Sequence, residues 1–419
     1  MRTPLLLRAL CGALPSFVVS LSACHPGPAS EGDELATKTG IQCAELPPAE
    51  PILPENSGEA WQWVEVPGSY CRSQSPSAPG SEGNAGFAIR FGTTRRDHLL
   101  IYLQPGGACF SEESCQLSAA NIKTARALFD GRSVQMSNFG IFASSDEDNP
   151  FHGWTQVFVP YCSGDVFAGT RSEVGAPLSG VSSYLGHRNL QKFLAPLVAT
   201  FRGAGKNPKV VLAGSSAGGF GTLFNFEQVQ AAFCDRPLDL VNDSAPLFPE
   251  KSEDEGKTLL PTCLQEHWRA LWNLDAILPR SCDECRSEGG LHHLMYDLAR
   301  RYPQSRFSLV ASAGDRVIPA FFSSSVAGCG QGPCGRGVEP AAFATGLREL
   351  ETRFEERRAE SAGWKVWTLG YSAHASLLGK EASERLNDPA VFPLRALRNL
   401  TQSKLDGDLA RWLAEQIQD

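Results

Sequence analysis

A serine on a turn between a strand and a helix is the first residue whose surroundings suggest chemistry. Residues 214–218, Gly-Ser-Ser-Ala-Gly, match the pattern G-x-S-x-G, which lifts the central serine above a sheet. The apolar run 210–213 before it predicts a buried strand, and an amphipathic helix is predicted after it. Glycine suits both flanking positions because the turn crowds the backbone. The pattern therefore predicts that Ser216 is a nucleophile.

The serine needs a general base to take its proton, and the base needs an acid to orient it. Four histidines follow Ser216 in the chain, and three of them lie in a stretch that breaks the alternation of strands and helices. The fourth, His374, directly follows the predicted strand 365–369. Because the base of such a site comes last in the chain and follows a strand, we predict that it is His374.

Two aspartates compete for the role of the orienting acid. Asp315 follows the predicted strand 307–311, and Asp243 follows the preceding strand 238–242. Either carboxylate could reach the carboxyl edge of the sheet. The acid usually comes from the strand before the strand of the histidine, which favours Asp315. Asp243 is then expected to support the following helix or the pocket.

An oxyanion hole is the remaining requirement, because negative charge develops on the substrate oxygen during attack. One N–H donor is expected from Ala217, the residue after the nucleophile. The other is expected from the loop after the predicted strand 98–103, where Gly106 and Gly107 let the backbone approach closely. The sequence does not choose between these two glycines.

The elements that must position these residues are short apolar runs that alternate with helical stretches. This order predicts an α/β fold with a doubly wound, mostly parallel sheet. The predicted strands are 87–91, 98–103, 156–160, 209–213, 238–242, 307–311 and 365–369. The stretch 248–305 is too long for a plain crossover, so we interpret it as an inserted, cysteine-containing cap.

Within this cap, Cys282 and Cys285 have the spacing C-x₂-C and are followed by His292 and His293. Zinc ligands have similar spacing, so a zinc-supported surface binding protein is one alternative. In an oxidising compartment the same thiols would form disulfides instead. We expect the second outcome, and no metal or other cofactor.

Composition excludes several classes of protein. The 419 residues are 42% hydrophobic and 20% charged, which is enough for a core and a solvated surface, so the chain is not predicted to be disordered. The net charge is −8 and no stretch is basic enough for phosphate contacts, so no nucleic-acid partner is expected. The expected partner is a small-molecule or polysaccharide ester. The sequence does not indicate whether the protein is a monomer or an oligomer.

The N-terminus has the pattern of an export signal. Two arginines flank the start of an apolar run, 9–21, that is too short to span a membrane comfortably. The run leads into Leu-Ser-Ala-Cys24, which resembles the bacterial lipobox, where the signal is cut before a cysteine that is then lipidated. An ordinary signal with an incidental Cys24 is the alternative. We expect a signal peptide at 1–23, a lipidated Cys24 with a flexible tether at 24–58, and a catalytic domain at 59–419. Only the lipid would hold the protein to the membrane, on the extracytoplasmic side of an outer membrane or cell surface.

Five motifs occur in the order seen in one known family. They are 102–109 (Tyr-Leu-Gln-Pro-Gly-Gly-Ala-Cys) with Cys115, 161–165 (Tyr-Cys-Ser-Gly-Asp), 214–219 (Gly-Ser-Ser-Ala-Gly-Gly), Asp243-Ser244 and Gly314-Asp315. Over about residues 60 to 380 the chain resembles the pectin acetylesterase / Notum family of α/β-hydrolase-like serine esterases. The resemblance implies an extracellular esterase whose triad positions match Ser216, Asp315 and His374. It also implies that Asp165 lines the pocket and that Cys109 and Cys115 form a disulfide fixing the oxyanion loop.

The chain has 13 cysteines, of which Cys11 would leave with the signal and Cys24 would carry lipid. Cys329 and Cys334 are separated by Gly-Gln-Gly-Pro, which permits a turn, so we expect them to close a small disulfide loop. With the pair implied by the resemblance, seven cysteines remain, which can form at most three bonds and leave one over. These seven are Cys43, Cys71, Cys162, Cys234, Cys263, Cys282 and Cys285.

The leading functional hypothesis is hydrolysis of a short acyl ester, acetyl above all, on a polysaccharide. Where plant members of the family carry an acidic residue and a tryptophan, this chain has Gln104 and Ala108. One aromatic wall of the pocket is therefore missing, which argues against pectin itself. Deacylation of a lipidated protein or lipid is the second hypothesis, and a catalytically silent surface protein is the third.

Overall fold

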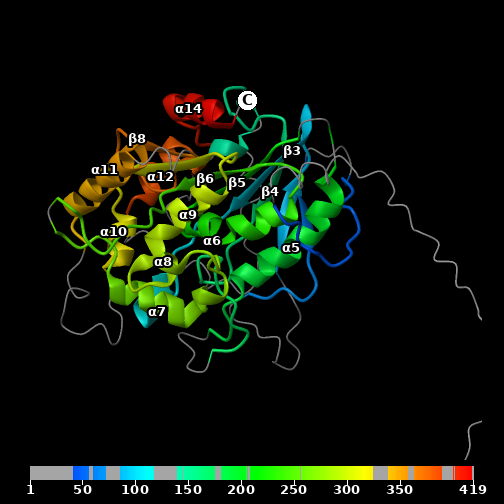
Figure 1. Ribbon diagram of the computed structural model, residues 1–419. Helices are drawn as coiled ribbons and strands as arrows, with labels where there is room; N and C mark the ends of the chain where they lie inside the picture. Colours follow the sequence, from blue (N-terminus) through cyan, green and yellow to red (C-terminus); the bar gives the residue numbers. More distant parts are fainter. Residues whose placement is uncertain are drawn as a thin grey trace, which may run out of the picture.

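The computed structural model describes residues 41–55, 60–71, 85–117, 139–143, 145–174, 181–203, 205, 208–254, 256–323, 338–356, 363–388, 400 and 402–417. These residues form an eight-stranded sheet with helices on both faces (Figure 1). Within the same ranges, every helix is too short or too polar to cross a lipid bilayer. The predicted fold class, α/β with a mostly parallel sheet, is confirmed.

The sheet is parallel except at one edge. Across it lie β1 (Gln62–Glu65), β2 (Gly86–Arg90), β4 (Trp154–Val159), β3 (Arg95–Leu103), β5 (Val210–Ser215), β6 (Leu238–Asp243), β7 (Phe307–Ser312) and β8 (Trp364–Leu369). β2 runs antiparallel to β1 and β4, and all the other pairings are parallel. All seven predicted strands are present within a few residues. β1 was not predicted, because four residues at an edge give too little alternation to recognise.

The helices bury their apolar sides on the two faces of the sheet. They are α2 (Glu112–Leu117), η2 (Gly140–Phe142), α5 (Gly186–Phe201), α6 (Ala217–Ala232), α7 (Thr262–Trp272), η3 (Leu274–Ala276), α8 (Asp283–Arg286), η4 (Gly290–His292), α9 (His293–Arg301), α10 (Val317–Phe322), α11 (Pro340–Glu356), η6 (Ser376–Leu378), α12 (Lys380–Leu386) and α14 (Gly407–Ile417).

Two hydrophobic clusters follow from the alternation of side chains along the strands. On β3, Leu99 and Ile101 point into the cluster that α5, α6, α9 and α11 cover. Leu100 and Tyr102 point into the opposite cluster, which α12 and α14 cover (Figure 1). The predicted catalytic residues all follow strands that pack in this way, so the sheet fixes where these residues lie.

The predicted cap, 248–305, is a long excursion between the adjacent strands β6 and β7, and it has two parts. Its last helix, α9, packs against the sheet as an ordinary crossover helix through Leu294 and Leu298. The rest, with α7, η3, α8 and η4, is additional. The interpretation as an inserted cap stays a prediction, and it applies to the part before α9.

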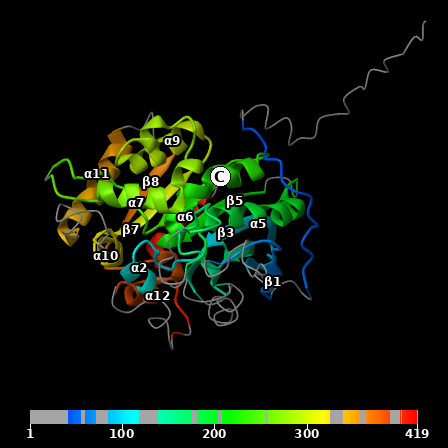
Figure 2. The ribbon, with the colours of Figure 1, turned by 90° about the horizontal axis from the view of Figure 1, so that it is seen from below.

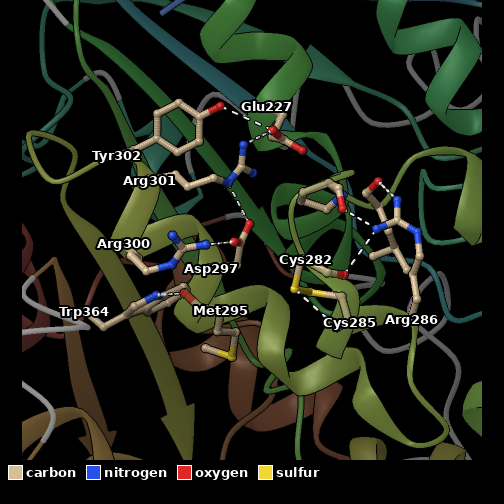
Figure 3. Close-up of polar contacts among 12 residues, drawn as sticks. Glu227, Cys282, Cys285, Arg286, Met295, Asp297, Arg300, Arg301, Tyr302 and Trp364 are labelled. Atoms are coloured by element: carbon tan, nitrogen blue, oxygen red, sulfur yellow. Dashed lines mark hydrogen bonds and ion pairs between the residues drawn. A yellow bond between two sulfur atoms is a disulfide. The ribbon is translucent and has the colours of Figure 1, made fainter. Parts of the chain in front are cut away.

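Figure 3 shows how α9 is fastened to its neighbours. The Arg301 guanidinium bridges Asp297 on its own helix, at 2.7 Å, and Glu227 of α6, at 2.5 Å. The Trp364 indole N–H donates to the carbonyl of Met295 at 2.7 Å. These contacts join α9 to β8 and to α6, whose first residue follows the predicted nucleophile.

Part of the expected tether, 24–58, belongs to the folded body. A disulfide joins Cys43 to Cys234 just beyond α6. The Ile52 N–H donates to the Thr200 hydroxyl of α5 at 2.8 Å. Residues 41–55 are therefore held against α5 and α6, and the body begins before the predicted boundary at 59. The expected signal peptide, 1–23, and Cys24 lie outside the described residues.

Four disulfides join described cysteines, and Cys109–Cys115, implied by the resemblance, is one of them. The others are Cys43–Cys234, Cys71–Cys162 and Cys282–Cys285. Three disulfides thus form within the seven remaining cysteines, as the count allows, and Cys263 is the one left over. Cys263 is itself disulfide-bonded, so none of the seven is a free thiol. The expected pair Cys329–Cys334 lies outside the described residues.

Candidate active site

The backbone at Ser216 has the strained geometry of a nucleophile turn. Ser216 lies between β5 and α6 with φ 53° and ψ −118°. Residues other than glycine rarely adopt this backbone conformation. Its N–H donates to the Asp243 carbonyl at 2.8 Å, and its carbonyl accepts from the Phe220 N–H at 3.0 Å. The fold therefore holds Ser216 at the carboxyl edge of the sheet, as the G-x-S-x-G pattern predicts.

The glycines on either side of the turn are required by close backbone contacts. A methyl group on Gly214 would collide with the carbonyl of Gly218. One on Gly218 would collide with the carbonyl of Leu103, the last residue of β3. The turn is thus pressed against the start of the predicted oxyanion loop, which brings two parts of the site together.

Asp315 and His374 form a buried hydrogen-bonded pair. Asp315 Oδ2 lies 2.9 Å from His374 Nδ1, and the two residues are 1% and 5% exposed. The other carboxylate oxygen of Asp315 accepts from the N–H groups of Val317, at 2.8 Å, and Ile318, at 3.2 Å, which begin α10. Both oxygens are therefore fixed, and the carboxylate in contact with His374 is that of Asp315, rather than that of Asp243.

Asp243 contacts the nucleophile turn and the loop after β8. Its carboxylate accepts from the Ser215 hydroxyl at 2.6 Å and from the Leu377 N–H at 2.9 Å. Burial is the largest influence on its pKa and raises it, while these hydrogen bonds oppose the rise. Asp243 is not among the residues that line the pocket described below. Of the two expected roles, support of the following helix fits its contacts, because its backbone carbonyl accepts from the N–H of Ser216, the residue before α6. Asp243 lies behind Ser216 and holds the loop that carries His374.

The predicted oxyanion loop is held by contacts at its far end. The Cys109 N–H donates to the Gly164 carbonyl at 2.7 Å, and the Tyr184 hydroxyl donates to the Cys109 carbonyl at 3.0 Å. Gly107 has φ +72° and lines the same pocket as Ser216. Gly106 is not among the lining residues, and the N–H groups of both glycines stay predicted donors.

Asp165 supports the backbone instead of lining the pocket. Its buried carboxylate accepts from the Ser163 hydroxyl at 2.5 Å and from the N–H groups of Phe167, Gly169 and Gly186, the last at 2.7 Å. Burial, the largest influence, raises its pKa, and these hydrogen bonds lower it. Its neighbour Val166 reaches the pocket, so the role implied for Asp165 by resemblance is corrected.

Gln104, one of the departures from the plant pattern, also has a structural role. Its side-chain carbonyl accepts from the Tyr161 N–H at 2.9 Å, and its own N–H donates to the Val159 carbonyl at 3.1 Å. A neutral side chain satisfies this buried position, and the start of the oxyanion loop is fixed to β4.

The pocket beside Ser216 is apolar. Its empty space is about 320 Å³, including the part open to solvent. The lining residues are Gly107, Ala108, Phe110, Val166, Ser216, Ala217, Phe220, Trp268, Ile318, Phe321 and Phe322. None of these carries a charge, and the Ser216 hydroxyl and the Trp268 indole N–H are the polar side-chain groups among them. Such a lining suits the hydrocarbon part of an acyl group.

Trp268 of α7 occupies a wall of this pocket that sequence reasoning left open. Its ring lies 5.7 Å from that of Phe110 and 6.2 Å from that of Phe220, measured between centroids. α10 supplies Phe321 and Phe322, and the ring of Phe322 lies 6.1 Å from that of Trp268. Figure 2 shows α2, α7 and α10 together at one end of the molecule. We had expected an aromatic wall to be missing at Ala108. The cap supplies one from another element, which no local signal in the sequence could indicate.

The cap helix α7 is fastened on two sides. His267 Nε2 donates to the Phe110 carbonyl at 2.7 Å. At the other end, the Arg171 guanidinium donates to the Ala270 carbonyl at 2.7 Å, and Asn273 donates to the Thr170 hydroxyl at 2.8 Å. These contacts fix the position of Trp268 in the pocket.

The zinc alternative is not supported. Cys282 and Cys285 are joined in a disulfide, which removes the two thiolates that such a site needs. Across the described part of the chain, no group of three or more His, Cys, Asp or Glu side chains could hold a metal ion.

Comparison with known protein families and sequences gives a consistent picture. The family model for pectinacetylesterases matches residues 79–292. The palmitoleoyl-protein carboxylesterase notum2 of Xenopus laevis is 29% identical over 218 residues, covering 49% of this chain and 42% of the relative. The corresponding NOTUM of Drosophila melanogaster is 26% identical over 209 residues, covering 48% of this chain and 30% of the relative. The chain thus spans less than half the length of these curated relatives.

Among solved structures, the Wnt deacylase Notum from Drosophila has a TM-score of 0.50 and 18% sequence identity. The likeness covers 83% of this chain and 95% of that one. At such low identity the likeness shows the fold alone, which is that of a Notum-like α/β hydrolase.

Proposed function

The chain belongs to the pectinacetylesterase family, which makes it a carboxylic ester hydrolase, and on this basis we propose that Ser216, His374 and Asp315 are its catalytic triad. The Asp315–His374 hydrogen bond supports this assignment most strongly, because it lies at the sheet edge where the strained Ser216 turn opens on an apolar pocket. A histidine held in this way has Nε2 free to act as the base.

The proposed reaction has two halves. As Ser216 Oγ attacks the ester carbonyl carbon, His374 Nε2 takes the hydroxyl proton, and Asp315 stabilises the resulting imidazolium. The N–H groups of Ala217 and Gly107, with Gly106 as the alternative, would hold the oxygen that becomes negative. When the bond to the alcohol breaks, His374 returns the proton to the leaving oxygen. Water then attacks the acyl-serine in the same manner and releases the carboxylic acid.

The first candidate substrate is a short acyl ester, acetyl above all, on a polysaccharide. The family to which the chain belongs supports it, as does a pocket lined by uncharged side chains. Gln104 and Ala108 stand where plant members have an acid and a tryptophan, so pectin is not the polysaccharide that we favour.

The second candidate is deacylation of a lipidated protein or a lipid. Aromatic and aliphatic side chains of the oxyanion loop, α6, α7 and α10 surround the pocket, which suits a longer hydrocarbon chain. The relatives in frog and fly are named palmitoleoyl-protein carboxylesterases, which supports the same candidate.

One experiment tests both the triad and the acyl group. Purified protein should hydrolyse p-nitrophenyl esters of two to sixteen carbons, and the acyl length with the highest kcat/KM separates the candidates. Ser216→Ala should lower kcat by at least about 10³-fold. Ser308→Ala, which removes the hydroxyl of another buried serine on β7, should leave kcat unchanged. Full activity of Ser216→Ala would end the proposal, whatever the acyl length.

We also propose that the protein acts outside the cytoplasm, anchored by lipid on Cys24. The four disulfides among described residues support export, because such bonds persist in oxidising compartments. In a bacterial host, the wild type should fractionate with membranes and Cys24→Ala should become soluble. A wild type that is already soluble after export would contradict the anchor and leave the esterase proposal untouched.

A further inference from the structure

Three strained residues from distant parts of the chain meet at the carboxyl edge of the sheet. Ser216, Ser244 and Ala375 all have positive φ, at 53°, 61° and 62°, although none is glycine. The Ala375 N–H donates to the Ser244 hydroxyl at 3.1 Å. Such conformations cost about 1–3 kcal/mol each and persist only where surrounding contacts determine them. The contacts here converge on one side chain.

That side chain is Asp243, which is 0% exposed. One carboxylate oxygen accepts from the Ser215 hydroxyl, at 2.6 Å, and from the Leu377 N–H, at 2.9 Å. The other accepts from the Ser244 hydroxyl at 2.9 Å. All these donors are neutral, so the network keeps a carboxylate out of water without a bonded cation, which is costly unless its hydrogen bonds are well placed.

The network also reaches the strand that leads to the oxyanion loop. The Tyr102 hydroxyl donates to the Ser215 hydroxyl at 3.0 Å, and Ser215 in turn donates to Asp243. Tyr102 is the residue before the end of β3 and is fully buried. The chain of hydrogen bonds therefore links β3, the Ser216 turn and the loop after β8.

Asp243 holds the two sides of the proposed triad by different groups. Its backbone carbonyl accepts from the Ser216 N–H at 2.8 Å. Its carboxylate accepts from Leu377, the third residue after His374, at the start of η6. The same residue thus grips the nucleophile turn and the loop of the base.

We propose that Asp243 is a positioning residue that sets the distance between Ser216 Oγ and His374 Nε2. It touches no substrate and leaves the orientation of the His374 ring to Asp315. The proposal rests on the proposed function, because it presumes that Ser216 and His374 react together. A displacement of about 1 Å between reacting groups can cost on the order of 100-fold in rate, so loss of this grip should be seen in kcat.

The test compares Asp243→Asn with Asp239→Asn. Both aspartates lie on β6, but Asp239 is at the opposite end of the strand and away from the site. Active sites are counted by the end point of labelling with a serine-reactive phosphonate, and kcat per labelled site is measured on a soluble p-nitrophenyl ester. For Asp243→Asn we expect kcat per site about 10- to 100-fold below wild type, with KM within about threefold. For Asp239→Asn we expect wild-type values.

A merely structural role for Asp243 gives a different result. It would lower the melting temperature or the fraction of labelled protein and leave kcat per labelled site at the wild-type value, which would overturn the proposal. Should Asp243→Asn fail to fold, Ser215→Ala serves, since it removes one hydrogen bond to the carboxylate. It should lower kcat per site at least about threefold, and wild-type kcat in that variant would overturn the proposal too.

Failure of the proposed function looks different again. In that case Ser216→Ala keeps its activity, or the phosphonate labels another serine. If Ser216→Ala is inactive and both Asp243→Asn and Ser215→Ala keep the wild-type kcat per site, the triad stands and only the role of Asp243 falls.

Discussion

Asp315 Oδ2 lies 2.9 Å from His374 Nδ1, although 59 residues separate them in the chain. β7 and β8 are paired in parallel from Phe307 and Trp364 onward, so their carboxyl ends reach the same edge together. The loops that follow then need only a few residues to bring acid and base into contact. The register of two strands thus determines the central hydrogen bond of the site.

Replacing the acid should impair turnover more than binding. In Asp315→Asn the amide can present its N–H₂ to His374 Nδ1 and favour the wrong tautomer, so we expect kcat to fall on the order of 10³-fold with KM little changed. Steady-state kinetics on a p-nitrophenyl ester measures this. Asp239→Asn, a half-buried control on β6, should keep full activity. Wild-type kcat in Asp315→Asn would exclude Asp315 as the acid.

Trp268 should limit the length of the acyl group. Trp268→Ala opens the pocket toward α7, so the kcat/KM for eight-carbon esters should rise about tenfold relative to that for two-carbon esters. The ratio is read from the same series of p-nitrophenyl esters. Trp412→Ala, on α14 across the sheet, should leave the ratio unchanged. An unchanged ratio in Trp268→Ala would mean that the acyl group lies elsewhere.

Two disulfides should separate stability from activity. Cys43–Cys234 closes a segment of 191 residues and Cys109–Cys115 one of only 6. When the cysteines are replaced by alanine, chain entropy predicts that the free energy of unfolding falls by up to about 5 kcal/mol for the long segment and by about 2 kcal/mol for the short one. The short disulfide lies beside the oxyanion loop, so its loss should lower kcat about tenfold or more, whereas loss of the long one should not. Urea unfolding and ester hydrolysis measure the two effects, and the opposite pattern would contradict this division.

Asp239 should make stability depend on pH. Burial raises its pKa to about 6, whereas an unfolded aspartate titrates near 3.9. Between these values the folded state binds the proton more tightly, so the contribution of Asp239 to stability falls as pH rises from about 4 to 6 and then stays constant. The free energy of unfolding of Asp239→Asn, compared with that of wild type, should therefore increase by up to about 3 kcal/mol as the pH rises from 4 to 7.

Urea midpoints at the two pH values test this prediction. Asp148→Asn makes the same chemical change at an exposed position and should show no such gain. A constant difference between Asp239→Asn and wild type from pH 4 to 7 would show that Asp239 titrates alike in both states.

The chain order of Ser216, Asp315 and His374 could be predicted because each follows a strand that its own sequence reveals. The role of Asp243 could not, since its partners Ser215 and Leu377 are set by how two loops close over the sheet edge. The place of Trp268 in the pocket could not be predicted for a similar reason. It depends on contacts of α7 with Phe110 and Arg171, which come from other parts of the chain. The spacing of residues along the chain gives no information on such contacts between distant elements.

The disulfide Cys43–Cys234 also decides which way the molecule faces when it is held by its N-terminal side. Ser216 precedes α6 and Cys234 follows it, so the two lie at opposite ends of a helix of 16 residues, about 24 Å long. A pull applied through residue 43 therefore reaches α6 at the end remote from the pocket. An attachment made through residue 43 is therefore tied to the end of α6 opposite Ser216.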